Sequence, residues 1–146
     1  GDQADLPTLM DDVFAVRMAG AQPTHSEHRS LGPFLERIPA PAPIGIANAD
    51  AAARGKSIFE SPDVACLGCH VRPLMSTKQI VDVGTGGAFK VPSLVGVGAR
   101  APFLHDGCAT TLMDRFTTCG GGDLHGKTSQ LTPAQLSDLV AYLETL

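Results

Sequence analysis

The stretch CLGCH, residues 66–70, decides how the rest of the chain is interpreted. Two cysteines separated by two residues, with a histidine directly after the second, have the spacing typical of c-type haem attachment. The two thiols can add across the two vinyl groups of a porphyrin, which places the histidine beneath the iron as an axial ligand. The sequence therefore predicts one covalent haem c, held by Cys66, Cys69 and His70.

Two other uses of a C-x-x-C spacing need a context that this chain lacks. A redox dithiol lies at the start of a helix, within a pattern of alternating strands and helices. A zinc site needs a second pair of ligands at short spacing. The other two cysteines, Cys108 and Cys119, stand apart in a segment rich in Thr and Gly. Covalent haem is therefore the preferred interpretation.

Composition limits the classes of partner. The chain has 146 residues and a formal net charge of -4, and its Lys and Arg residues are scattered. Nucleic acid is therefore not an expected partner. The apolar runs are interrupted before they reach membrane-spanning length, and no stretch has the layout of a signal peptide. We expect a soluble chain with no transmembrane segment and one main core.

Residues 1–48 are predicted to form an N-terminal extension. In LPTLMDDVFAVRMAG, residues 6–20, Thr8 can cap one amphipathic helix with Asp11 at the capping-box position. The PAPAP stretch at 39–43 predicts a stiff, extended tether. Between them, His25 and His28 are interpreted as solvated linker residues, because a metal site needs more ligands than two.

Residues 49–146 are predicted to form a monohaem domain that is mostly helical with long loops. A first helix begins at Asn48 or Asp50 and ends near Phe59, and a short helix is expected in TTLMDRF, residues 110–116. Thr132 caps a closing helix with apolar residues on one face. Residues 78–94 contain a Gly-rich turn at 84–87 and predict a small hairpin or an irregular loop.

Two segments carry a resemblance to a known family. GKSIFESPDVACLGCH, residues 55–70, resembles the first helix and haem-attachment segment of class I c-type cytochromes, and LVAYLETL, residues 139–146, resembles their closing helix. The resemblance covers roughly residues 50–146 and implies an all-α class I cytochrome c fold. It also implies a helix crossing in which Gly55 allows close approach to Leu139 and Tyr142, while Phe59 lies beside the haem.

A finer resemblance lies in FKVPSLVGVGARAPFLHDGCATTLMDRF, residues 89–116. It is similar to the C-terminal, electron-transferring domain of bacterial dihaem cytochrome c peroxidases. Those proteins carry two haem motifs, whereas this chain has one and its first 49 residues contain no cysteine. The peroxide-reacting haem of that family is therefore missing. Pro92 of the VPSL turn and Arg100 are candidate haem contacts, the latter through a forked ion pair with a propionate.

The second axial ligand decides whether the iron only transfers electrons or also binds substrates. Met75 is too close in sequence to His70 to cross to the opposite face, and the resemblance implies a structural or propionate-side role for His105. The family's methionine ligand corresponds to Cys119. We expect a disulfide between Cys119 and Cys108 instead, because haem attachment implies an extracytoplasmic compartment in which such pairs oxidise.

Two candidates for the second ligand remain. A disulfide at both ends of the short helix would hold the following loop, GGGDLHG at 120–126, so that His125 can reach the iron; Met113 is the alternative. His125 could instead be a surface histidine in its own Gly-rich turn. Asp82 and Asp123 could contribute to a calcium site, but no ligand ladder supports one.

These features predict a periplasmic or otherwise extracytoplasmic electron carrier with redox protein partners, which dock near the thioether edge. An alternative from a different class is a haem enzyme or peroxidase-like domain with a labile distal ligand. A third is a subunit of a larger electron-transfer complex, docked through residues 1–48.

Overall fold

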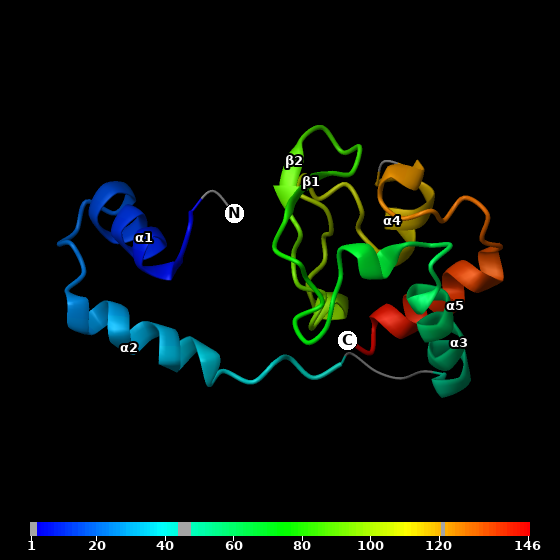
Figure 1. Cartoon of the computed structure of the whole chain (residues 1–146), viewed down its shortest axis with the longest axis horizontal. Helices are drawn as coiled ribbons and strands as arrows, with labels where there is room; N and C mark the ends of the chain where they lie inside the picture. Colours follow the sequence, from blue (N-terminus) through cyan, green and yellow to red (C-terminus); the bar gives the residue numbers. More distant parts are fainter. Residues whose placement is uncertain (1–2, 44–47, 121) are drawn as a thin grey trace. The chain divides into compact units, whose positions relative to one another are not determined.

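The computed structural model describes residues 3–43, 48–120 and 122–146. The chain forms two compact units, Gly1–Ala40 and Pro41–Leu146 (Figure 1). The predicted boundary between extension and haem domain, at 48/49, adjoins residues 44–47, which lie outside the described residues. Each unit is described by itself below.

The first unit contains α1 (Leu6–Asp11), the π-helical turn η1 (Asp12–Arg17) and α2 (His25–Glu36). Asp5 caps α1, because its carboxylate accepts a hydrogen bond from the backbone N–H of Thr8 at 2.9 Å. The prediction that Thr8 caps this helix was therefore wrong: the helix begins three residues earlier, with Pro7 in its first turn.

A second helix, α2, occupies the stretch that its prolines had suggested was a linker. Thr24 and Glu27 form a capping box at its start, and Pro33 is accommodated inside it. His25 and His28 thus lie on a helix, and Nε2 of His28 lies 3.0 Å from Oδ1 of Asp11. This contact joins α2 to α1.

The second unit is built on two crossed helices, α3 (Ala49–Glu60) and α5 (Pro133–Leu143), which lie side by side in Figure 1. Of the two caps considered for α3, Asn48 or Asp50, the structure has Asn48, and the predicted Thr132 cap of α5 is confirmed. Gly55 permits the crossing: a Cβ added there would lie 1.8 Å from the backbone oxygen of Asp138. Arg54 completes the contact with a forked ion pair to Asp138, with both N···O distances 2.7 Å.

Short elements connect these helices. They are the 3-10 turns η2 (Cys66–Gly68), η3 (Val97–Ala99) and η4 (Gly122–Leu124), the strands β1 (Ile80–Asp82) and β2 (Ala88–Lys90), and α4 (Leu112–Thr117). The strands pair antiparallel with Val81 opposite Phe89, so residues 78–94 form the hairpin rather than the irregular loop. The predicted short helix is α4, capped by Thr111 with Asp114.

The core of the second unit joins the helix crossing to the loops. Its buried members are Phe59, Met75, Val97, Leu112, Leu139, Tyr142 and Leu143. The fold is therefore helical with long irregular segments and one small sheet, as predicted. In the described residues, no helix combines the length and the apolar character needed to cross a bilayer.

Candidate haem-binding site

The CLGCH segment forms a tight turn directly after α3. Ala65 adopts a left-handed backbone (φ 61°) that ends the preceding stretch, and η2 then begins at Cys66. The backbone N–H groups of Cys69 and His70 both donate to the carbonyl of Cys66, at 3.2 and 3.0 Å. Neither Cys66 nor Cys69 is in a disulfide. One turn thus presents two thiols and an imidazole, the three groups that covalent haem attachment requires.

His70 is held in one tautomer by the backbone. Its ring is buried, and Nδ1 lies 3.0 Å from the carbonyl oxygen of Met75. Because a carbonyl can only accept, Nδ1 carries the proton and Nε2 keeps a free lone pair. Burial lowers the pKa of His70, against the opposing effect of the Met75 carbonyl, so the ring is neutral. The Met75 carbonyl is therefore the acceptor that fixes the orientation of the His70 ring.

Met75 has a structural role in this geometry. Its backbone is left-handed (φ 52°), while its side chain is buried in the core beside Phe59 and Leu139. A non-glycine residue in this conformation costs about 1–3 kcal/mol, which the surrounding packing must offset. The Met75 side chain packs in the core, and the residue contacts His70 through its backbone carbonyl.

Tertiary contacts bring His125 to the same place. The chain turns after α4 at Gly120 (φ 110°), and the backbone N–H of Lys127 donates to the carbonyl of Val64 at 3.0 Å. Asp123 closes the loop by accepting from the backbone N–H groups of Thr128 and Ser129, at 3.0 and 2.9 Å. The segment that carries His125 is therefore tied to the residues just before CLGCH.

The two imidazoles have the spacing of a ligand pair. The ring centroids of His70 and His125 lie 6.5 Å apart with 31° between the planes. A metal bound between two imidazoles at about 2.0 Å from each nitrogen would separate the ring centres by roughly 6 Å. Nδ1 of His125 is buried and has no hydrogen-bond partner in the described residues. The donor set and its spacing thus fit an iron with two histidine ligands.

The charge state of His125 suits the same chemistry. Burial, then the positive charge of Arg115, then His70 lower the pKa of His125 to about 3. The ring is therefore neutral across the physiological pH range. Only a neutral imidazole has a lone pair to offer a metal.

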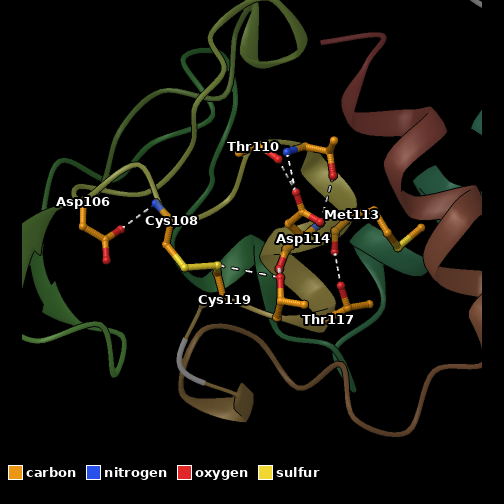
Figure 2. The surroundings of a disulfide bond; sticks show 9 residues. Asp106, Cys108, Thr110, Met113, Asp114, Thr117 and Cys119 are labelled. Carbon is orange, nitrogen blue, oxygen red and sulfur yellow. Dashed lines mark hydrogen bonds between the residues drawn. A yellow bond between two sulfur atoms is a disulfide. The ribbon is translucent and has the colours of Figure 1, made fainter.

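The other two cysteines form the predicted disulfide, which is confirmed. The Cys108 and Cys119 sulfurs are bonded, with Cα atoms 6.0 Å apart, and the bond spans the two ends of α4 (Figure 2). Cys119, at the position of the resembling family's methionine ligand, is thereby excluded as a ligand. In Figure 2, Met113 lies on the side of α4 away from the disulfide, and it is half-buried.

The other predicted site residues lie in different surroundings. Phe59 is buried and packs against Tyr142, with ring centroids 5.3 Å apart. Pro92 and Arg100 are exposed, and the Arg100 guanidinium donates to the backbone carbonyl of Ser93. His105 stacks on Phe89 of β2, with centroids 4.0 Å apart. The structure thus groups His125 with His70, while His105 belongs to the hairpin.

The two aspartates considered as calcium ligands make hydrogen bonds within their own loops. Oδ1 of Asp82 accepts from the backbone N–H of Gly84 at 2.8 Å, and the Asp123 carboxylate is used by Thr128 and Ser129. In the part of the chain that the structure describes, no three His, Cys, Asp or Glu side chains cluster as a metal site would need.

Arg115 is a site residue that the sequence did not indicate. It lies on α4, and its Nη2 donates to the backbone carbonyl of His125. Burial lowers the pKa of Arg115 to about 10, so the guanidinium remains charged at neutral pH. An arginine on a short amphipathic helix normally points to solvent. No local pattern marks this one as buried.

Comparison with known proteins gives two curated relatives and one solved structure, and no family model matches the chain. The gamma subunit of hydrazine synthase from Kuenenia stuttgartiensis is 32% identical, over 66% of this chain and 41% of the relative. A cytochrome-c peroxidase from Denitromonas iodatirespirans is 39% identical, over 48% of this chain and 20% of the relative.

The solved structure is hydrazine synthase from Kuenenia stuttgartiensis, pressurised with xenon. The match covers 93% of this chain and 59% of the hydrazine synthase chain, with a TM-score of 0.75 and 28% sequence identity. The chain spans less than half the length of either curated relative. Together with CLGCH, these similarities support a c-type cytochrome-like domain with haem c as its cofactor, and they single out no specific family.

Proposed function

We propose that this chain is a monohaem c-type cytochrome of the class I fold, which accepts one electron from a redox protein and passes it to another outside the cytoplasm. The observation that carries the proposal is the pair of imidazoles beside the CLGCH turn, the buried His70 and the half-buried His125, whose ring centroids lie 6.5 Å apart. The Cys108–Cys119 disulfide supports an extracytoplasmic location, because disulfides persist there.

The chain's own residues favour electron transfer over catalysis. When bound through Cys66 and Cys69, haem c supplies a one-electron iron couple. His70 is oriented by the Met75 carbonyl, and His125 is carried by a loop with main-chain and side-chain anchors. With haem bound, His70 and His125 would both be available to hold the iron, which would leave no position open for a substrate.

A role within a larger assembly is part of the proposal. The relative with which this chain shares 32% identity is named as a subunit of hydrazine synthase. In the first unit, large apolar side chains are exposed that a stable monomer would tend to bury. They are Leu9, Phe14, Val16, Met18, Phe34, Leu35 and Ile38. We propose that this part of residues 1–48 docks the haem domain onto a partner protein.

A second candidate function is a peroxidase-like haem enzyme whose distal ligand leaves the iron. Two observations favour it: the 39% identity to a cytochrome-c peroxidase, and the buried Nδ1 of His125, which no described group orients. Absorption spectra of the pure protein separate the two functions. A carrier has low-spin bands that cyanide and carbon monoxide leave unchanged on mixing and shift only slowly, whereas an enzyme with an open iron has bands that shift at once.

The distal ligand can be identified by substitution. We expect His125→Ala to convert the whole low-spin spectrum to a high-spin one that binds carbon monoxide when reduced, because one axial position becomes vacant. Added imidazole is expected to restore the low-spin bands. Met113→Leu is the matched control, and its spectrum is expected to be that of the wild type. The opposite pattern, with Met113→Leu high-spin and His125→Ala unchanged, would make Met113 the ligand.

The docking role of the first unit can be tested in the full chain. Phe34→Ser with Ile38→Ser is expected to remove most of the association with a partner, because 62% of Phe34 and 54% of Ile38 are exposed and available for contact. The measurement is the mass of the complex isolated from the source organism, by light scattering after size exclusion. Leu74→Ser, at an exposed site in the second unit, is the control. Unchanged mass in the double variant would remove this docking surface.

A further inference from the structure

Arg115 contacts the segment that carries the proposed distal ligand. Its Nη2 donates to the backbone carbonyl of His125, and its guanidinium carbon lies 4.7 Å from the centre of the Phe116 ring. The interaction is made to the main chain, so it restrains the position of residue 125 without engaging its imidazole. A loop rich in glycine has many alternative conformations, and a charge-assisted hydrogen bond selects one of them.

The surroundings of Arg115 differ from those of three other arginines. In the described residues, no carboxylate lies within ion-pair distance of its guanidinium, whereas Arg17, Arg54 and Arg72 all have acidic partners. The side chain is partly buried, where the effective dielectric constant is lower than in water. A lone positive charge is costly to bury. The free-energy cost of placing this charge here must therefore be offset by the interactions that Arg115 makes.

The same charge acts on every group of the site. It lowers the pKa of His70 and of His125, and it opposes the rise in pKa that burial causes at Cys66. Two of these groups are the proposed iron ligands, and Cys66 belongs to the CLGCH turn. Arg115 is thus electrostatically coupled to both proposed ligands and to the attachment turn.

We propose that Arg115 is a positioning residue that holds His125 in reach of the iron and, as an uncompensated cation, raises the reduction potential. The inference rests on the proposed function. Reduction adds one electron, supplied by a one-electron donor protein, and lowers the charge at the iron by one unit. A fixed positive charge nearby stabilises the reduced state relative to the oxidised state.

Three variants separate the two effects. Arg115→Gln removes the charge and keeps an N–H donor, Arg115→Lys keeps the charge with a different reach, and Arg115→Met removes both. Lys90→Gln removes one exposed positive charge from β2 as a control. Each variant is studied as the haem-loaded full chain. The readouts are the midpoint potential by spectroelectrochemistry and the rate at which carbon monoxide displaces the distal ligand of the reduced protein.

In Arg115→Gln, the equilibrium constant for reduction by a fixed donor is expected to fall about tenfold for the loss of one partly buried charge. This corresponds to about 59 mV for a one-electron couple. Arg115→Lys is expected to retain the wild-type potential, and Lys90→Gln to change it far less. Carbon monoxide is expected to bind several-fold faster in Arg115→Met than in Arg115→Gln, because only the former lacks a donor for the His125 carbonyl.

The results that would overturn this inference are specific to it. The charge does not set the reduction potential if the potential of Arg115→Gln equals that of Lys90→Gln. The same conclusion follows if the potential of Arg115→Lys falls as far below that of the wild type as the potential of Arg115→Gln does. If carbon monoxide binds equally slowly in wild type and Arg115→Met, the contact does not position the ligand. Should Arg115→Gln fail to retain haem, the comparison of Arg115→Lys with wild type decides in its place. A wild-type protein without low-spin haem would instead refute the proposed function.

Discussion

A protein with Cys66→Ser and Cys69→Ser is expected to contain no covalent haem when it is made by cells that mature c-type cytochromes. Serine hydroxyls do not add to the vinyl groups, so no thioether can form. The intact mass should equal that of the bare chain, whereas the wild type should carry the additional mass of one haem. After extraction with acidified solvent, the variant should be colourless and the wild type should remain red.

The second cysteine pair provides the matched control. Cys108→Ser with Cys119→Ser removes two thiols from the same unit and is expected to keep the haem, because these sulfurs are bonded to each other. It should lower the free energy of unfolding by about 2–4 kcal/mol, the usual contribution of a disulfide. If this control loses its haem while the Cys66 and Cys69 variant retains it, the assignment of the two pairs is wrong.

Gly55→Ala is expected to destabilise the second unit by about 3 kcal/mol or more, through overpacking at the α3–α5 crossing. The added Cβ would lie 1.8 Å from the backbone oxygen of Asp138 and 2.9 Å from Cβ of Tyr142. Backbone atoms cannot move aside as a flexible side chain can, so α5 must shift. Because α5 supplies Leu139, Tyr142 and Leu143 to the core, this shift also disturbs the packing around Phe59.

The sign of the Gly55→Ala effect distinguishes packing from helix propensity. Propensity alone predicts that alanine stabilises α3 by about 1 kcal/mol relative to glycine. Ala53→Gly, at an exposed position of the same helix, is the control, and it should cost about that amount. The measurement is urea unfolding of the haem-loaded protein, followed by far-ultraviolet circular dichroism. A stability of Gly55→Ala equal to or above that of wild type would show that the helices do not meet as closely as described.

Elements with strong local patterns could be predicted from the sequence. The closing helix carries a capping box at Thr132, and the first helix of the haem unit carries a cap at Asn48, so hydrogen bonds within four residues define where each begins. The second helix of the extension was missed because Pro33 inside it argued against a helix, although Thr24 and Glu27 form a capping box. The helix forms nonetheless, and the contact of His28 with Asp11 at 3.0 Å joins it to α1.

The candidate site also has features that the local sequence predicts and features that depend on tertiary contacts. CLGCH by itself predicts the chemistry of attachment and the proximal histidine, since all its groups lie within one turn. The pairing of Cys108 with Cys119 was predicted from the compartment which that chemistry implies, and the structure confirms this pairing. Only the tertiary structure decided that His125 faces His70 and that Arg115 holds its carbonyl. These contacts depend on how a glycine-containing loop returns to Val64. Residues 55 positions apart leave no periodic trace in a sequence, because their approach is set by packing rather than by local spacing.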